Sequence, residues 1–421
     1  MTIDIHAIRE RFPALKRPVV YLDNPGGTQI VQDSIDRIND YLIECNANFH
    51  GVFASSRESD VILAEARAAA ADFLNAKVPQ EIVFGPNMTS LTFHFSRALA
   101  RTWKQGDKIL LTRLEHDANI TPWVMAAEER GCQISYVDFN PADGTLNMEE
   151  MEAALLEEPV LVAIGYASNA LGTINPVKEI VSMSHSAGAL VYVDAVQYAP
   201  HSPIDVQNLG CDFLVFSAYK IFGPHIGILY GRYDLLESLP AYKVRPASDI
   251  PPEKFETGTK NHEGIAGLLG TFEYLNWLGE NYGAEFIDQY SPNFQGRKLN
   301  LKCAMAAIRN YEYGINQAVL DTLEETPGVT LYGPRVLTHM EQRVPTFGFR
   351  VKDIDPRTIA EKLDKHGIFT WSGNYYALSV TERLGVEDSG GMVRVGAVHY
   401  NTVDEITRFG KVLAEIVTSL A

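Results

Sequence analysis

Three polar residues follow apolar, strand-like runs and could carry covalent chemistry. Asp194 ends the run LVYVD, Lys220 comes just after FLVFS, and Asn169 follows VLVAIGYAS. Most lysines are exposed to solvent, but Lys220 precedes Gly223–Pro224, which predicts a sharp turn rather than a polar helix face. A lysine in a desolvated pocket can lose its proton and form a Schiff base. An aspartate facing a pyridine nitrogen would keep such a ring protonated and electron-withdrawing.

A second segment could bind a phosphate. The stretch FGPNMTSL, at 84–91, passes from a strand through a Gly-Pro pair into a predicted helix whose first turn holds Thr89 and Ser90. Backbone N–H groups at a helix N-terminus stabilise an anion. The alternative is that Asn87 or Thr89 only caps the helix.

Two further residues could contact a ring and a carboxylate. His116 follows the run KILLT within TRLEHDANITPW, where a neutral imidazole could stack on an aromatic cofactor ring. Arg394 alternates with the apolar Val393 and Val395, so on a strand it would point away from them. A buried arginine needs an anion, and its planar fork suits a carboxylate. A structural histidine and an exposed edge-strand arginine are the alternatives.

Strands that alternate with helices are expected to position these residues. Helices are predicted between several strands, for example at 119–130 and 176–187. Near-continuous apolar strands with helical crossovers predict a mainly parallel sheet that is covered on both faces. Ligands bind such sheets beyond the carboxyl ends of the strands. The strand-like runs lie at 81–85, 108–112, 133–139, 160–167, 190–194, 213–217 and 227–231.

The pattern changes in the last third of the chain. Long helices are predicted at 264–290 and 294–313, followed by short strand-like pieces and a terminal helix from about 403. This change predicts a second, smaller α+β unit. The expected domains are an N-terminal arm at 1–20, a large cofactor-binding domain at 21–265, and an interdomain helix with a small domain at 266–421.

Composition limits the classes of partner. The 421 residues include 36 lysines and arginines against 53 aspartates and glutamates, a net charge of −17, which argues against nucleic acid or an anionic membrane as the main partner. No apolar run approaches the roughly 20 residues that span a bilayer, and the first residues lack the apolar core of a secretory signal. The four scattered cysteines show no metal spacing, so we expect no metal site and a cytoplasmic protein with reduced thiols.

Several motifs occur in a fixed order, namely EHDAN, ASNALGT, VDAVQ, FSAYKIFGP, FETGT and VRVGAVHYNT. In this order the chain resembles the class V aminotransferase family of fold type I pyridoxal 5′-phosphate (PLP) enzymes. Within that family it resembles the group I cysteine desulfurases, from about Tyr21 to the C-terminus. The resemblance implies PLP as cofactor and a mainly parallel seven-stranded sheet in a large domain beside a smaller α+β domain.

The resemblance also implies roles for individual residues. Lys220 would carry PLP as an internal aldimine and move the Cα proton, while Asp194 would pair with the pyridine nitrogen. His116 would stack on the ring, and Arg394 would hold the substrate α-carboxylate. Thr259 matches a family threonine that reaches the phosphate of the other subunit, so a homodimer with shared sites is expected. The remaining expected cofactor contacts are Gln197, Asn169, Thr89, Met88, Asn87, Ser217 and Tyr219.

One departure from the family pattern bears on function. Cysteine desulfurases carry a nucleophilic cysteine on a loop that matches residues 369–380, where this chain has Tyr376 at the cysteine position and Trp371 at a nearby arginine position. A tyrosine hydroxyl cannot form a persulfide. A persulfide-relay desulfurase is therefore not expected. Tyr219 and Asp117 replace two family histidines.

The main hypothesis is a PLP-dependent lyase or transferase that acts on an α-amino acid and cleaves a bond at Cβ. It would use external aldimine and quinonoid chemistry, as a C–S lyase or as a β-decarboxylase of the aldol type. The pair Tyr219–Lys220 and the stretch VHYNT also resemble desulfurase-like proteins without the cysteine, one of which decarboxylates aspartate. The alternatives are an aminotransferase, an amino-acid epimerase and a non-catalytic scaffold. Expected substrate contacts beside Arg394 are Asn24, Tyr375, Tyr376, Trp371 and His225.

Overall fold

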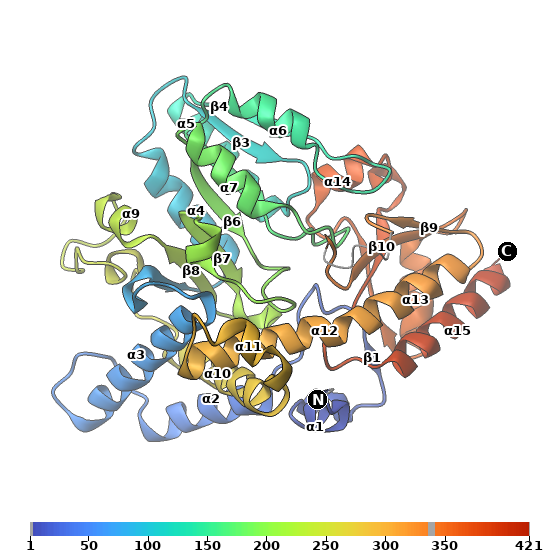
Figure 1. Cartoon of the computed structure of the whole chain (residues 1–421), viewed down its shortest axis with the longest axis horizontal. Coiled ribbons are helices and arrows are strands. Elements are labelled where there is room, and N and C mark those ends of the chain that lie inside the picture. Colours follow the sequence, from blue (N-terminus) through green and yellow to red (C-terminus); the bar gives the residue numbers. More distant parts are fainter. Residues whose placement is uncertain (1–2, 336–341, 421) are drawn as a thin grey trace.

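The larger part of the molecule is built on a seven-stranded sheet in the order β2-β8-β7-β6-β5-β3-β4. Its strands β3, β4, β6, β7 and β8 are labelled in Figure 1. The computed structural model describes residues 3–335 and 342–420. All pairings in this sheet are parallel except those that β8 makes with β2 and β7. The mainly parallel seven-stranded sheet is therefore confirmed. The strands are β2 (Ile82–Gly85), β3 (Lys108–Thr112), β4 (Gln133–Val137), β5 (Leu161–Gly165), β6 (Leu190–Asp194), β7 (Phe213–Ser217) and β8 (Gly227–Gly231).

Both faces of the sheet are buried except at the edge strand β4, where Gln133 and Tyr136 are exposed. In β5, Leu161 and Ala163 pack into one hydrophobic core while Val162 and Ile164 pack into the other, as the side-chain alternation of a strand requires. The first core is closed by α4 (Met88–Ala100) and α5 (Thr121–Arg130). The second is closed by α3 (Ala54–Leu74), α6 (Met148–Leu155), α7 (Val177–Ser186) and α10 (His262–Tyr282).

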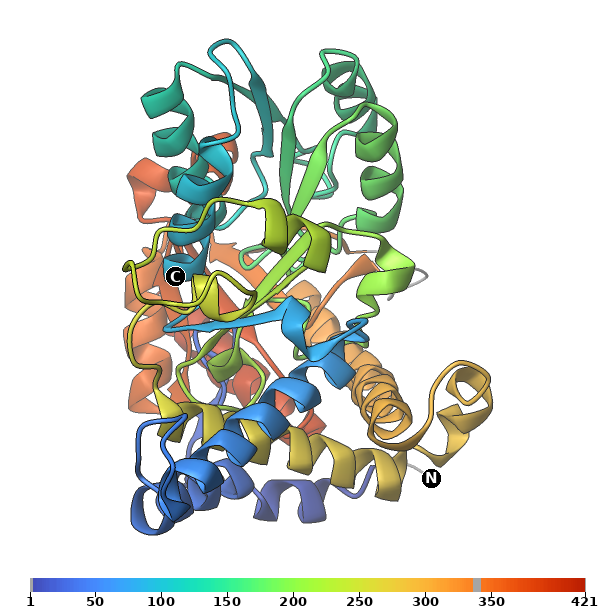
Figure 2. The same ribbon diagram turned by 90° about the vertical axis from the view of Figure 1, so that its left-hand side faces the viewer.

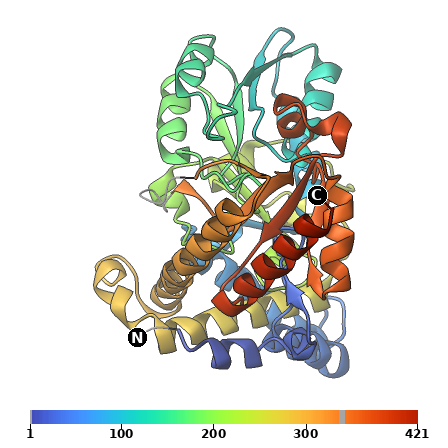
Figure 3. The ribbon, with the colours of Figure 1, turned by 90° about the vertical axis from the view of Figure 1, so that its right-hand side faces the viewer.

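The C-terminal third forms a four-stranded antiparallel sheet in the order β12-β13-β10-β9. Here α12 (Gly296–Glu325) and α15 (Val403–Leu420) pack side by side (Figure 3). The smaller α+β region is thus present, while its predicted boundaries stay predictions. The other elements are β9 (Val329–Tyr332), β10 (Thr346–Val351), α13 (Pro356–Lys365), β11 (Ile368–Phe369), β12 (Trp371–Gly373), α14 (Leu378–Arg383) and β13 (Met392–Gly396).

Two predicted helix ends were wrong. The helix predicted at 264–290 ends at Tyr282, where Gly283 follows it, and a separate short helix α11 occupies Ile287–Tyr290. The helix predicted at 294–313 continues to Glu325. It continues because Ile315, Val319 and other apolar residues extend its buried face into the core of the C-terminal sheet.

The N-terminal segment crosses to the C-terminal sheet before it enters the large sheet region. It contains α1 (Ile5–Glu10), β1 (Val20–Tyr21) and α2 (Gln32–Glu44), and α2 and α3 both pack against α10 (Figure 2). Strand β1 pairs in parallel with β11, and Asp23 forms a bridge with Gly396 at the end of β13. This route places Asp23 and the following turn beside Arg394. Two short helices, α8 (Val206–Leu209) and α9 (Tyr233–Ser238), complete the fold.

Candidate active site

A cavity of about 570 Å³ lies at the carboxyl ends of the parallel strands, between the large sheet and the C-terminal sheet. Its wall combines segments that follow β3, β5, β6 and β7 with the start of α4 and parts of β12 and β13. The predicted convergence of strand ends is therefore observed. Its polar and aromatic wall includes Asp23, Thr89, His116, Asn169, Asp194, Gln197, Ser217, Tyr219, Lys220, Trp371, Tyr375, Tyr376 and Arg394, with Met88 among the apolar residues.

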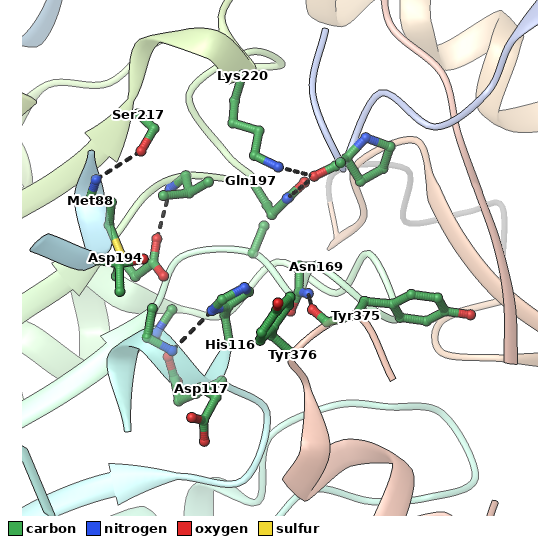
Figure 4. A pocket seen from close by; sticks show the side chains of 18 of the residues that line it. Met88, His116, Asp117, Asn169, Asp194, Gln197, Ser217, Lys220, Tyr375 and Tyr376 are labelled. Carbon is green, nitrogen blue, oxygen red and sulfur yellow. Dashed lines mark hydrogen bonds between the residues drawn. The ribbon is translucent and has the colours of Figure 1, made fainter. Parts of the chain in front are cut away.

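Lys220 occupies the end of a short 3₁₀ turn directly after β7 and is buried. Its Nζ donates a hydrogen bond to the Pro25 carbonyl, toward which Gln197 also points (Figure 4). Burial and the nearby Arg394 lower the pKa of Lys220 to about 7, against an opposing effect of Asp23 and Asp194. A large fraction of Lys220 is therefore the neutral, nucleophilic amine near neutral pH.

Asp194 ends β6 and points into the same cavity. Its Oδ1 accepts a hydrogen bond from the Val196 N–H at 2.9 Å. Burial raises the pKa of Asp194 to about 6, although that hydrogen bond and Lys220 favour the charged form. A cationic ring nitrogen beside this carboxylate would offset the cost of its burial.

His116 presents a neutral imidazole to the cavity. Its Nδ1 accepts a hydrogen bond from the Ala118 N–H at 3.0 Å. Burial, together with Lys220 and Arg394, lowers the pKa of His116 to about 4. A flat, uncharged ring in this position suits stacking on an aromatic cofactor.

Glu115, which the sequence interpretation did not select, anchors the segment before His116. Its carboxylate accepts hydrogen bonds from Gly165 N–H at 2.8 Å and from Asn119 Nδ2 at 2.7 Å. Burial raises the pKa of Glu115 to about 7. The residue ties the loop after β3 to the end of β5. An acidic residue between the apolar Leu114 and His116 was the available signal.

The N-terminus of α4 opens into the cavity, as expected for a phosphate site. Ser217 Oγ accepts a hydrogen bond from the Met88 N–H at 2.9 Å, and Thr89 lies on the wall. Asn87 instead caps the helix, since its Oδ1 accepts from the Ser90 N–H at 2.8 Å. Asn87 is absent from the wall among the described residues, and its expected contact with the cofactor stays a prediction.

Arg394 lies in the middle of β13 and is buried on the cavity wall. Its Nη2 pairs with Asp23 Oδ1 at 3.0 Å, and its Nη1 donates to the Asn169 carbonyl at 3.2 Å. Within the described residues, neither Arg394 Nε nor Asn169 Oδ1 has a hydrogen-bond partner. Buried polar groups are normally paired, so these two atoms suit a wall that binds a further polar molecule.

The loop that carries Tyr375 and Tyr376 is held against the large sheet. Both tyrosines have a φ of 58°, an uncommon conformation for bulky residues. Asn169 Nδ2 donates to the Tyr375 carbonyl at 2.8 Å, and the Asp117 N–H donates to the Tyr376 carbonyl at 2.6 Å. The ring of Tyr376 therefore lies beside that of His116, with centroids 5.6 Å apart (Figure 4).

Three further predicted contacts, besides Asn87, lie outside this wall as the structure describes it. The side-chain amide of Asn24 is already hydrogen-bonded within the protein, because its Nδ2 donates to the carbonyls of Tyr21 and Gly396 at 2.9 and 2.8 Å. His225 is exposed and stacks on Tyr219, with ring centroids 4.9 Å apart. Thr259 is exposed in the single chain, and its contact with another subunit stays a prediction.

The chain matches the family model described as "Aminotransferase class-V" over residues 20–300 and 296–409. It belongs to the class V aminotransferase family. It is 32% identical to a cysteine desulfurase of Pectobacterium atrosepticum, with 97% of each chain covered. It is also 32% identical to the aminotransferase-like protein FGM3 of Gibberella zeae, with 96% of each covered. The apo cysteine desulfurase of Thermococcus onnurineus has a TM-score of 0.87 at 29% identity, covering 100% of this chain and 99% of that one.

Membership makes the chain a PLP-dependent enzyme of fold type I. The observed wall fits this cofactor. It offers a lysine whose pKa is lowered to about 7, a buried aspartate and a neutral imidazole. A helix N-terminus lies beside the hydroxyls of Thr89 and Ser217. In the described residues, no cluster of three or more histidine, cysteine, aspartate or glutamate side chains is arranged for a metal ion. Among the described helices, none combines the length and apolar character that a bilayer crossing requires.

We expect the rate at which the apo-protein takes up the cofactor to change with pH around pH 7 rather than around pH 10. The neutral amine of Lys220 is the nucleophile, and its lowered pKa means that this form is populated above about pH 7. The second-order rate of PLP binding, followed by visible absorbance in stopped flow, should rise between pH 6 and 8 and then level off. A rate that keeps rising up to pH 10 would show that Lys220 has an ordinary lysine pKa.

Proposed function

We propose that this enzyme binds an α-amino acid and cleaves a bond at its Cβ atom, releasing an uncharged group held through sulfur or carbon. One observation carries the proposal. The wall retains Lys220, Asp194 and Arg394. It also holds Tyr376, the residue that the family resemblance matches to the sulfur-accepting cysteine of desulfurases. Amino-acid chemistry at Cα is thus supported, while transfer of sulfur to the enzyme is not.

Each residue has a defined task in this proposal. When bound, PLP supplies an electron sink for charge that develops at the substrate Cα. Arg394 holds the α-carboxylate, and Lys220 removes the Cα proton as its neutral amine. With PLP bound, Asp194 would keep a proton on its ring nitrogen, and His116 would offer a neutral imidazole to its ring.

The charges on the wall favour an uncharged leaving group. Among the described wall residues, Lys220 and Arg394 supply the lysine and arginine side chains, and both already have tasks. Asp23, Glu115, Asp117 and Asp194 add carboxyl groups. A second substrate carboxylate would have no free cationic partner on this wall. Burial of that unpaired charge would be energetically unfavourable. The wall therefore supports cleavage of a Cβ–S bond, or of a Cβ–C bond to an uncharged carbon group, over β-decarboxylation.

A homodimer in the cytoplasm completes the proposal. The exposed Thr259 and a group of exposed apolar residues, which include Ile43, Val52 and Phe53, suit burial against a second copy. The four cysteines are free thiols, which suits a reducing compartment.

The experiment that tests the proposal is a visible-absorbance titration of the purified holoenzyme with a panel of amino acids. Products are identified by mass spectrometry. The proposal predicts a spectral response together with a Cβ-cleaved product such as alanine or pyruvate. A keto acid that keeps the whole side chain would instead identify an aminotransferase. Racemised substrate alone would identify an epimerase, and no response to any amino acid would leave only a scaffold.

We also expect no persulfide on the protein after incubation with L-cysteine. Cys45, Cys211 and Cys303 are buried, and Cys132 lies outside the described cavity wall. Tyr376 cannot accept sulfur. Thiol-blocking followed by intact-mass measurement should show an unmodified chain. A stoichiometric mass gain of one sulfur atom would contradict the assignment of Tyr376 to the cysteine position.

A further inference from the structure

Asp23 and Arg394 form an opposite-charge pair on the cavity wall, with Asp23 Oδ1 and Arg394 Nη2 3.0 Å apart. The side chain of Arg394 is 4% exposed, whereas that of Asp23 is 25% exposed toward the cavity it lines. The two groups therefore offer a cationic and an anionic contact side by side to any molecule in the cavity.

A purely structural ion pair elsewhere in the chain looks different. Arg67 and Glu256 are bound through two hydrogen bonds at 2.7 and 2.9 Å, and the Glu256 side chain is fully buried. Glu256 also accepts from the Phe84 N–H at 2.8 Å. Bidentate pairing of this kind fixes a charge pair in the interior. Asp23 instead uses one oxygen for Arg394 and keeps part of its carboxylate open.

A tight turn holds the Asp23 carboxylate in this place. The Asp23 carbonyl accepts from the N–H groups of Gly26 and Gly27 at 2.9 and 3.2 Å. A Cβ at Gly26 would come within 2.4 Å of Asp23 Oδ2, so only glycine leaves room for the carboxylate. The same turn brings the Pro25 carbonyl to Lys220 Nζ. The one turn thus contacts Arg394 through Asp23 and Lys220 through Pro25.

An α-amino acid carries a carboxylate and an ammonium group on one carbon atom. On this wall its carboxylate would bind Arg394, and its ammonium group would then face the neighbouring carboxylate. In a molecule that has the carboxylate but lacks the ammonium group, the carboxylate would be repelled by Asp23, and no ammonium group would offset that repulsion.

We propose that Asp23 binds the substrate α-ammonium group and so selects zwitterionic amino acids over simple carboxylic acids. This role rests on the proposed function and adds a specificity-determining residue to it. Asp23 contacts the substrate directly, beside Arg394.

The test compares 2-aminoisobutyrate with isobutyrate, two probes that differ only in the amino group. 2-Aminoisobutyrate has no Cα proton, and isobutyrate has no amino group that could react with the cofactor. Binding of both probes to the holoenzyme is therefore measured without turnover, by calorimetry. In Asp23→Asn we expect the dissociation constant of 2-aminoisobutyrate to rise at least tenfold. We expect that of isobutyrate to fall at least threefold, because the repelling charge is gone. Asp23→Glu should retain the preference for the amino acid.

The matched control is Asp138→Asn, which removes another partly exposed carboxylate that pairs with an arginine, Arg383, outside the cavity wall. It should change neither dissociation constant. A residue with only a structural role would not move the two dissociation constants in opposite directions. The proposed role would therefore be overturned if Asp23→Asn weakened the binding of both probes equally, or changed the binding of neither. A wild-type holoenzyme that gives no spectral response to any amino acid would instead overturn the proposed function.

Discussion

Replacing Lys220 with alanine is expected to abolish covalent attachment of the cofactor and to lower kcat/KM by about 10⁴-fold, the upper range for a positioned proton-transfer group. On the described wall, neither His116 nor Tyr219 can take its place. His116 has its pKa lowered to about 4 and its Nδ1 engaged by Ala118, while burial raises the pKa of Tyr219. The measurement is steady-state turnover of the amino acid that gives the strongest spectral response, together with the absorbance of the bound cofactor.

The Lys220→Arg variant is the control for charge. It keeps a cation in the cavity but cannot form the covalent link, because arginine stays protonated. We expect it to be as inactive as the alanine variant. Thermal unfolding should change little in Lys220→Ala, since removal of a buried amine also removes its desolvation cost. An alanine variant with more than a tenth of the wild-type kcat/KM would refute the assignment of Lys220.

Replacing Arg394 with alanine should raise the dissociation constant for amino acids and lower kcat/KM by about 10²- to 10³-fold. Truncating one partner of a buried, hydrogen-bonded charge pair costs about 2–5 kcal/mol, and each 1.4 kcal/mol is about tenfold in affinity. The variant also leaves Asp23 without its cationic partner. Spectral titration gives the dissociation constant, and steady-state kinetics separate KM from kcat.

Arg394→Lys separates charge from geometry. It retains the positive charge but lacks the planar fork, so we expect a loss between those of wild type and Arg394→Ala. Both variants should still take up the cofactor, because Lys220 and the N-terminus of α4 are retained. Amino-acid affinity within threefold of wild type in Arg394→Ala would contradict the carboxylate-binding role.

The large sheet was predictable because burial on both faces makes its strands apolar at nearly every position. Helix ends were harder to place. Gly314 within α12 and Gly283 after α10 look alike in the sequence, yet one is inside a helix and the other ends one. Tertiary packing of Ile315 and Val319 decides between them.

In the site, residues that follow strands were predictable, because parallel strands bring their carboxyl ends to one edge. Asp23 and Pro25 were missed as site residues, since they enter from a turn that is distant in sequence from Arg394 and Lys220. Asn24 was expected at the substrate, but its amide satisfies the carbonyls of Tyr21 and Gly396. The left-handed backbone of Tyr375 and Tyr376 has no sequence signal, because bulky residues disfavour it.

The central claim is that this enzyme carries its cofactor on Lys220. Lys302 provides an internal comparison, because burial also lowers its pKa to about 7, yet its Nζ donates to the Phe73 and Ile204 carbonyls away from the cavity. The most direct test is borohydride reduction of the holoenzyme, proteolysis and peptide mass mapping. The structure predicts one phosphopyridoxyl group per chain, on the peptide that contains Lys220. An unmodified Lys220 peptide, or the same label on Lys302, would contradict the claim.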